Sequence, residues 1–155
     1  MDDLYFMKQA LIEASKAYDI NEVPIGAVVV YNNKIISRAH NQVELLNDST
    51  AHAEMLAITA AFEQLGSKYL QDATLYVTLE PCIMCSGATY WSKIGRIVFA
   101  ARDEKNGFSK YFPTAIDGSF PVHPFHPKTI LQYGLCKEES IALMQSFFQN
   151  LRQKR

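Results

Sequence analysis

Cysteine is scarce in this sequence, which has three cysteine residues in 155. An odd and low count does not support a framework of disulfides, which excludes the small, disulfide-rich class of secreted domains. The count instead favours a protein that works in a reducing compartment. With 48% hydrophobic residues, the chain can form one domain with a sizeable core.

Long apolar runs and a basic leader are also absent. The longest apolar stretch, at residues 23–31, is far too short to cross a bilayer. The first residues, MDDLYFMKQALIEA, are acidic where a signal peptide is basic, and they contain no continuous apolar core. We therefore expect a soluble, cytoplasmic protein with no membrane partner.

The two parts of the chain carry opposite net charge, although the formal net charge of the whole is only −1. Residues 1–92 hold 5 Lys or Arg against 11 Asp or Glu, whereas residues 93–155 hold 10 against 5. Each basic residue alone is most simply a solvated surface group. Together, and with Arg152, Lys154 and Arg155 at the end, they are a weak hint of a surface that faces phosphates.

Helical and strand-like patterns alternate along the chain, and no internal repeat or linker divides it. Apolar residues at helical spacing predict helices at residues 3–19, 52–66, 81–91 and 137–152. Apolar, β-branched runs predict strands at residues 24–31, 34–39, 73–79, 94–100 and 129–133, the first two forming a hairpin. Candidate N-caps at residues 48–50 precede the second helix, and Pro81 suits the first position of the third. This order predicts one domain over residues 1–155, with an α/β layered fold that contains parallel strand pairs.

Two of the cysteines lie close together in the motif LEPCIMC, at residues 79–85. Cys82 and Cys85 are three residues apart in the first turn of a predicted helix, so they share one face, and the helix dipole favours thiolate there. Two thiolates at this spacing are half of a tetrahedral zinc site. Cys136 stands alone far downstream and no second C-x-x-C exists, so histidine must supply the rest.

Of the four histidines, His52 has the context that best suggests a ligand. His40, His123 and His126 are most simply surface or hydrogen-bonded residues. His52 opens a predicted helix with Glu54 two residues on, and with the thiols it completes the pattern H-x-E…P-C-x-x-C. This pattern is the signature of zinc-dependent base deaminases. With each half at a helix start, it is a much stronger signal than a lone C-x-x-C.

Three protein ligands leave one coordination position of a zinc ion open, which is typical of catalytic rather than structural sites. Deamination also needs a group that moves protons from water to a ring nitrogen and to the leaving amine, and Glu54 is the candidate. Because residues two apart do not face the same way on a regular helix, His52 and Glu54 must both lie in the first turn. Glu80 is a second carboxylate near the thiols, and we expect it to have a structural role as a charge at the helix N-terminus.

The sequence resembles the cytidine deaminase-like superfamily, and within it the bacterial tRNA-specific adenosine deaminases most closely. The matching stretches cover most of the chain apart from residues 104–128: EVPIGAVVV (22–30), RAHN (38–41), DSTAHAEMLAI (48–58), ATLYVTLEPCIMCSGA (73–88), KIGRIVFAARD (93–103) and, more loosely, FFQNLR (147–152). The H-A-E and P-C-x-x-C pieces belong to the whole superfamily, whereas the TLYVTLEPC run and its surroundings single out this branch.

The resemblance implies a three-layer α-β-α sandwich with a five-stranded mixed sheet, a homodimer, and hydrolysis of the wobble adenosine in a tRNA anticodon loop to inosine. It implies one Zn²⁺ per chain on His52, Cys82 and Cys85, with Glu54 as the catalytic proton shuttle. It also implies that Asn41 hydrogen-bonds to the base, although Asn41 on its own is most simply a polar residue that ends a strand.

The segment at residues 104–128 departs from the family pattern, because it has only a partial match to a G-S-L and lacks the asparagine of an Asn-His pair. It is rich in aromatic residues, namely Phe108, Tyr111, Phe112, Phe120 and Phe125. With the interleaved Lys105, Lys110 and Lys128, these rings suit stacking on splayed RNA bases. They equally suit packing of the loop onto the body or across a dimer interface.

Three functions remain open from the sequence. The first is an RNA adenosine deaminase. The second is a free-base or nucleoside deaminase acting on guanine or cytosine, for which Tyr90 and Trp91 would cap a small pocket. The third is a non-catalytic zinc module, which would have no use for Glu54 or for an open coordination position. The sequence does not specify which tRNA is read or in what sequence context.

Overall fold

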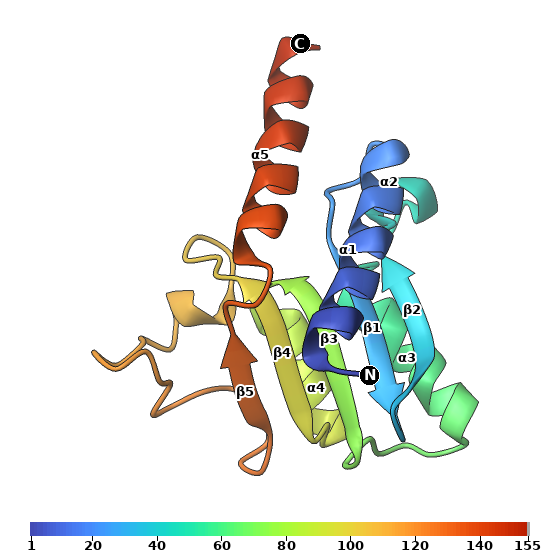
Figure 1. The fold of residues 1–155 in the computed structure, drawn as a ribbon, viewed down its shortest axis with the longest axis vertical. Helices are drawn as coiled ribbons and strands as arrows, with labels where there is room; N and C mark the ends of the chain where they lie inside the picture. Colours follow the sequence, from blue (N-terminus) through green and yellow to red (C-terminus); the bar gives the residue numbers. More distant parts are fainter. Residues whose placement is uncertain (155) are drawn as a thin grey trace.

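The computed structural model describes residues 1–154, so Arg155 lies outside the described residues. Its centre is a five-stranded mixed sheet with the strand order β2-β1-β3-β4-β5 (Figure 1). The strands are β1 (Gly26–Tyr31), β2 (Lys34–His40), β3 (Ala73–Leu79), β4 (Arg96–Ala101) and β5 (Ile130–Tyr133). β1 is antiparallel to β2 and β3, whereas the pairs β3–β4 and β4–β5 are parallel. The thiol motif follows β3, in the parallel half of the sheet.

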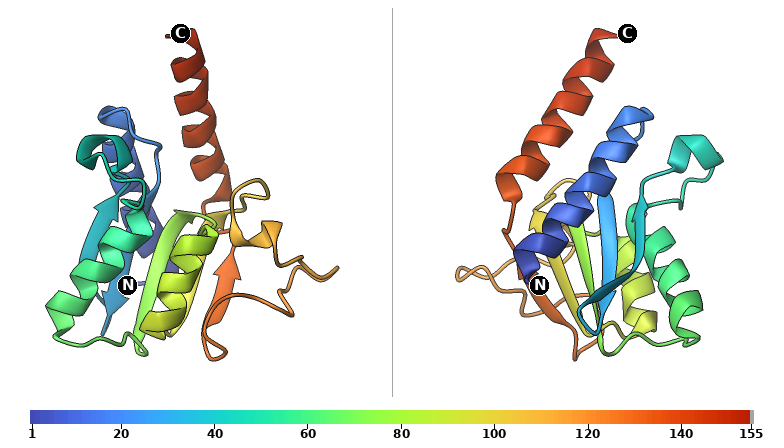
Figure 2. Two further views of the ribbon diagram at one scale, coloured as in Figure 1. Left: turned by 180° about the vertical axis from the view of Figure 1, so that it is seen from behind. Right: turned by 45° about the vertical axis from the view of Figure 1, so that its right-hand side comes forward.

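Helices cover both faces of this sheet. α1 (Asp3–Asp19) and α5 (Lys137–Gln153) lie on one face, and α3 (Ala53–Leu65) and α4 (Ile83–Ser92) lie on the other (Figures 1 and 2). Successive strand residues point into two different hydrophobic cores. Val28 and Tyr76 pack with α1 in one core, and Val29 and Val77 pack with α3 in the other. Burial on both faces explains why these strands are nearly continuous apolar runs. The predicted α-β-α sandwich with a five-stranded mixed sheet is confirmed.

Close packing of α1 on β1 depends on Gly26. A Cβ atom at this position would lie 2.0 Å from the carbonyl oxygen of Ala10 and 2.4 Å from the nitrogen of Ala14. The helix backbone therefore rests directly on the strand, and only glycine fits at this point of the contact. Gly26 is paired with His40 at the end of β2, so this contact also fixes the strand that leads into Asn41.

One predicted helix start and one predicted N-cap position were wrong. α4 begins at Ile83 rather than at Pro81, because Cys82 keeps an extended backbone (φ −72°, ψ 173°) and serves as the N-cap. α3 has its N-cap at His52 rather than at residues 48–50, where Asp48 instead caps a local turn. Both differences place predicted zinc ligands at the very start of their helices.

The polar segment at residues 42–50, between the second predicted strand and the second predicted helix, contains a short helix, α2 (Val43–Leu46). The backbone N–H groups of Glu44 and Leu45 donate to the buried carboxylate of Glu22 at 2.6 and 3.0 Å. Glu22 therefore satisfies the helix N-terminus from 22 residues upstream. No local sequence pattern indicates such a long-range cap.

α5 extends beyond the sheet toward the end of the chain (Figure 1). Its middle is tied to the end of α1, since the hydroxyls of Tyr18 and Ser146 lie 2.9 Å apart and Asn150 also donates to the Tyr18 hydroxyl. Phe147 is buried in the same contact. Within residues 1–154, no helix combines the length and apolar character needed to cross a membrane.

Candidate metal and catalytic site

The N-termini of α3 and α4 bring together one imidazole and two thiols. His52 is the N-cap of α3 and Cys82 is the N-cap of α4, with Cys85 in the first turn of α4. Nδ1 of His52 lies 3.5 Å from Sγ of Cys82 and 3.6 Å from Sγ of Cys85. In the described part of the chain, this is the single group of three or more such side chains close enough to share one ion.

The geometry of this trio fits zinc. A tetrahedral ion with bonds of about 2.3 Å to sulfur and about 2.0 Å to nitrogen separates its N and S ligand atoms by about 3.5 Å. The two observed N–S distances match that tetrahedral edge, and all three ligand atoms lie within 4.8 Å of one another. Two cysteines and one histidine are also the donor set expected for a zinc site with one open position.

The two thiols differ in pKa. A hydrogen bond from Cys85, together with one from His52, lowers the pKa of the Cys82 thiol to about 4. Hydrogen bonding to Cys82 and burial raise the pKa of Cys85. The pair therefore favours one thiolate and one thiol, whereas a bound metal ion favours the thiolate form of both.

Glu54 lies beside this trio as the second helical residue of α3, which satisfies the condition that it shares the first turn with His52. Its side chain is 3% exposed, and its Oε1 has no hydrogen-bond partner among residues 1–154. Burial, and to a smaller extent the nearby Cys82 thiolate, raise the pKa of the Glu54 carboxyl to about 7. A carboxyl group with this pKa can both accept and donate a proton near neutrality.

Asn41, which follows β2, is buried beside the start of α3. Its Oδ1 accepts a hydrogen bond from the Ala53 N–H at 2.9 Å, which satisfies one of the free amides of the helix N-terminus. This bond fixes the orientation of the amide, and Nδ2 has no protein partner within the described part of the chain. The predicted contact of Asn41 with a base stays a prediction, now one that would use Nδ2.

Glu80 has a structural role, as expected, but through different partners. Its carboxylate accepts backbone hydrogen bonds from Asp103 and Ser109, and it faces the guanidinium of Arg102. The N-terminus of α4, the partner that the sequence predicts for Glu80, is not among these groups. Sequence reasoning missed this contact because its members lie 23 and 29 residues apart.

The aromatic segment at residues 104–128 packs mainly onto the body. Phe108 and Phe125 are buried, and Phe112 and Phe120 are half-buried against the same core. Tyr111 differs, because 59% of its surface is exposed. Four of the five aromatic rings therefore pack onto the body of the domain. Tyr111 is the ring that is available for stacking on a base. Cys136 is buried at the start of α5 and does not belong to the ligand trio.

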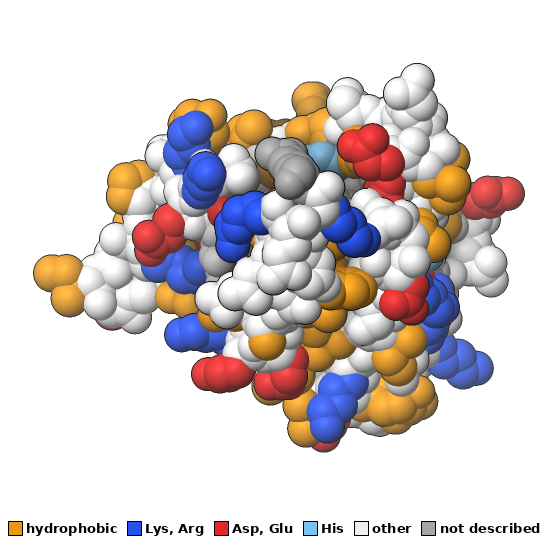
Figure 3. All heavy atoms as spheres, turned by 90° about the horizontal axis from the view of Figure 1, so that it is seen from above, with side chains coloured by type: hydrophobic (Ala, Val, Ile, Leu, Met, Phe, Trp, Pro, Cys, Tyr) orange, Lys and Arg blue, Asp and Glu red, His pale blue; other side chains and the backbone are white. Residues whose placement is uncertain are grey.

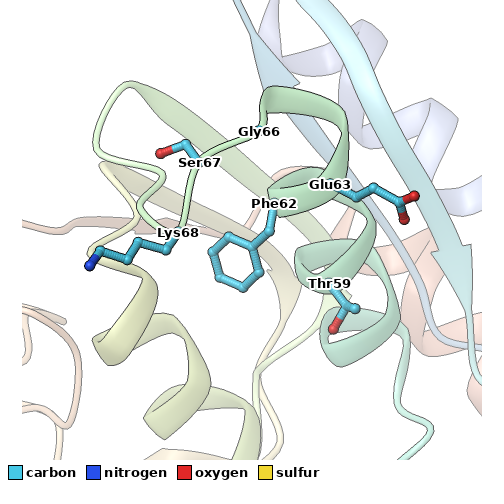
Figure 4. A pocket seen from close by; sticks show the side chains of 6 residues that line it. All are labelled: Thr59, Phe62, Glu63, Gly66, Ser67 and Lys68. Carbon is cyan, nitrogen blue, oxygen red and sulfur yellow. The ribbon is translucent and has the colours of Figure 1, made fainter.

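A shallow hollow of about 570 Å³ lies at the other end of α3 from His52 (Figure 4). Thr59, Phe62 and Glu63 of α3 line it together with residues 66–68 of the following turn. None of the predicted site residues takes part in it, so this hollow is separate from the ligand trio.

Known proteins that this chain resembles include zinc-binding deaminases. Residues 1–101 match the model of the cytidine and deoxycytidylate deaminase zinc-binding region. The tRNA-specific adenosine deaminase of Bacillus subtilis (strain 168) is 45% identical over 154 residues, which cover 99% of this chain and 92% of that relative. The chloroplastic tRNA(adenine(34)) deaminase of Arabidopsis thaliana is 46% identical over 159 residues, but these are 95% of this chain and only 12% of that much longer protein.

Solved structures of deaminases also resemble this chain. A chain from a study of A-to-I editing by tRNA:A34 deaminases at the wobble position of transfer RNA has a TM-score of 0.78 and 41% identity, and the match covers 90% of this chain and 98% of that one. Guanine deaminase from Bacillus subtilis has a TM-score of 0.63 and 39% identity, with 66% of each chain covered. The match to the tRNA deaminase structure is thus the more complete of the two.

Replacement of either thiol tests the metal site. We expect the wild-type protein to hold one zinc ion per chain, and Cys82→Ala and Cys85→Ala each to lose most of it, because two ligands cannot complete a tetrahedral site. Cys136→Ala is the matched control and should keep its zinc. Elemental analysis of purified protein measures this. Unchanged metal content in the Cys82 and Cys85 variants would rule out the proposed ligand set.

Proposed function

The chain belongs to the tRNA-specific adenosine deaminases, a branch of the cytidine and deoxycytidylate deaminase family, and we propose that it hydrolyses adenosine to inosine at the wobble position of a tRNA anticodon. The observation that carries this proposal is the buried Glu54 carboxylate, with an unpartnered oxygen, beside an imidazole and two thiols. We also propose that the chain is one deaminase domain, holds one zinc ion and works in the cytoplasm, where its RNA substrate would be.

The residues of the site would have separate roles in the reaction. His52, Cys82 and Cys85 would hold the zinc ion, which supplies a Lewis acid that lowers the pKa of a water molecule toward neutrality. Glu54 takes a proton from water, delivers one to the adenine ring nitrogen and later one to the amine that leaves from C6 as ammonia. The oxygen of water takes the place of that amine, so adenosine and water give inosine and ammonia. Asn41 would orient the base through its free Nδ2.

Charge supports RNA as the substrate. Arg152 and Lys154 are exposed at the projecting end of α5, and Lys and Arg side chains lie on both sides of this end (Figure 3). Positive groups at this position suit a phosphate backbone and have no evident use for a small neutral base. An anticodon base is already unpaired, so it leaves its stack at low cost to reach a buried site.

A free-base deaminase is the alternative, and the similarity to a guanine deaminase keeps it worth testing. The sequence feature that favoured it was a cap formed by Tyr90 and Trp91. In the structure these rings are 41% and 76% exposed, so within this chain they do not close a pocket. The more complete match to a tRNA deaminase structure favours the RNA substrate.

We propose that the exposed face of α4 forms a two-fold homodimer. Ile83, Tyr90 and Trp91 are exposed, and with Gly87 between them they follow the spacing of one helix face. Such a contiguous apolar face is typical of an interaction surface. Because Ile83 directly follows Cys82, each site would lie close to the subunit boundary.

Substitution of Glu54 tests its role in proton transfer. Glu54→Gln should keep zinc and the fold, while turnover falls by about 10²- to 10⁴-fold, because an amide cannot shuttle protons. Glu63→Gln, an exposed position on the same helix, is the control and should react at the wild-type rate. Steady-state rates of inosine formation measure the difference, and near-normal turnover in Glu54→Gln would assign the proton transfers to another group.

The substrate class is tested by one pair of assays on the wild-type protein. We expect inosine to form in an RNA stem-loop with adenosine at the wobble position, and no ammonia release from free guanine, cytosine or adenosine. A stem-loop with the same adenosine paired inside the stem is the control and should react slowly, because the base must first leave the duplex. Rapid deamination of a free base, with no reaction on the stem-loop, would establish the alternative function.

The basic end of α5 is tested through the salt dependence of RNA binding. The double variant Arg152→Gln/Lys154→Gln should bind the stem-loop more weakly, and the slope of log K against log salt should shrink by about 0.7 for each lost contact to single-stranded phosphate. Lys8→Gln/Lys34→Gln removes the same charge from two exposed positions in the acidic part of the chain and should leave the slope unchanged. An unchanged slope in the α5 variant would remove this end from the RNA-binding surface.

The proposed dimer is tested by light scattering at micromolar concentration. The wild-type protein should have twice the mass of one chain, and Trp91→Glu should shift the protein to monomers by placing a charge in the apolar contact. Ile116→Glu changes another exposed apolar residue, outside α4, and should stay dimeric. A monomeric wild-type protein, or a Trp91→Glu variant that stays dimeric, would contradict the assignment of this face.

A further inference from the structure

One buried carboxylate next to the ligand trio has no part in the reaction described above. The side chain of Glu80 is 0% exposed and lies between the end of β3 and Cys82. Its Oε1 accepts a hydrogen bond from the Asp103 N–H at 3.2 Å, and its Oε2 accepts one from the Ser109 N–H at 2.9 Å. Both oxygens are therefore directed to the segment at residues 103–109 that follows β4.

The same segment is held to the ligand turn at a second point. The Phe108 N–H donates to the carbonyl oxygen of Pro81 at 2.9 Å, directly before Cys82. The parallel register pairs Leu79 with Ala101, so the residues that follow β3 and β4 leave the sheet side by side. Three backbone N–H groups of segment 103–109 thus donate hydrogen bonds to this turn, two of them to the Glu80 carboxylate and one to the Pro81 carbonyl.

Packing around the carboxylate leaves no spare space. A Cβ atom at Gly107 would lie 1.9 Å from Oε2 of Glu80 and 2.5 Å from the carbonyl oxygen of Asp103. The backbone of the segment therefore lies directly against the carboxylate. Any side chain at position 107 would push the segment away from Glu80 or change the path of the turn.

The contact requires a carboxylate rather than a neutral group of the same shape. Both amides that face Glu80 are donors, so an amide side chain would meet one of them with its own NH₂ group. Arg102 approaches Oε1 with its Nε at 3.7 Å, and this buried Nε has no hydrogen-bond partner among residues 1–154. Loss of the negative charge would leave the partly buried guanidinium without its closest counter-charge.

We propose that Glu80 is a positioning residue that fixes segment 103–109 to the ligand turn, so that RNA bound along this segment is held in register with the site. This proposal rests on the proposed function. Lys105, Asn106 and Lys110 are exposed on or directly after the segment, and they can face the nucleotides that flank the target adenosine. The zinc ligands and Glu54 lie on α3 and α4, so release of the segment should impair RNA placement more than chemistry.

Kinetics of Glu80→Gln test this role, with each rate divided by the bound zinc. We expect kcat/KM on the stem-loop to fall by about 10- to 100-fold per zinc, mostly through KM. Glu13→Gln is the matched control, because Glu13 is an equally buried, hydrogen-bonded carboxylate that pairs with Lys16 and Arg38 on the other face of the sheet. If Glu80 has only a structural role, both variants should contain less zinc-loaded protein, while kcat and KM per bound zinc stay at the wild-type values. That result would overturn the proposal.

Gly107→Ala is the second variant and decides the outcome if Glu80→Gln does not fold. It displaces the segment without removing the carboxylate, so the same rise in KM is expected, and wild-type kinetics would overturn the proposal. In the double variant the losses should be smaller than the product of the single losses, because both act on one contact. Independent losses would contradict a shared mechanism. A wild-type enzyme that does not act on the stem-loop would instead refute the proposed function.

Discussion

The structure depends on the convergence of two helix N-termini, which brings His52 to within 3.6 Å of two thiols that lie 30 and 33 residues further along the chain. Every ligand sits at an N-cap or in a first turn, where the backbone supplies free amides and a favourable dipole. The sheet makes this possible, because β2 and β3 are separated only by β1 and end near the starts of α3 and α4. The two thiols and the imidazole form a donor set that suits a divalent cation, with the buried Glu54 carboxyl beside it.

Around this centre, buried polar side chains form hydrogen bonds to backbone groups that are distant in the sequence. Glu22 caps α2, Asn41 caps α3, and Glu80 holds the segment after β4. Each of these side chains accepts hydrogen bonds from backbone amides of a helix start or a loop that is distant in the sequence. The groups proposed for chemistry therefore lie at the starts of α3 and α4, and segment 103–109 is joined to the turn that carries two of them.

Much of this could be predicted from local sequence patterns. The helix at residues 3–19 has the predicted bounds, the hairpin and the parallel strands are present, and the H-x-E and P-C-x-x-C pieces meet as expected. Prediction failed where a distant residue decides the local structure. Pro81 has the conformational preference of a first helical residue, yet Cys82 is the N-cap. α2 forms because Glu22 is available, and Glu80 faces segment 103–109 rather than α4, and neither partner can be found from sequence spacing.

The most direct test of the central claim is X-ray absorption spectroscopy of the zinc in the purified protein. We predict two sulfur ligands at about 2.3 Å and two lighter ligands at about 2.0 Å, one of them the His52 imidazole and the other from solvent. That spectrum would place both thiols and a single protein nitrogen on an ion with an open position. A spectrum with four sulfur ligands, or with none, would rule out a zinc ion on His52, Cys82 and Cys85.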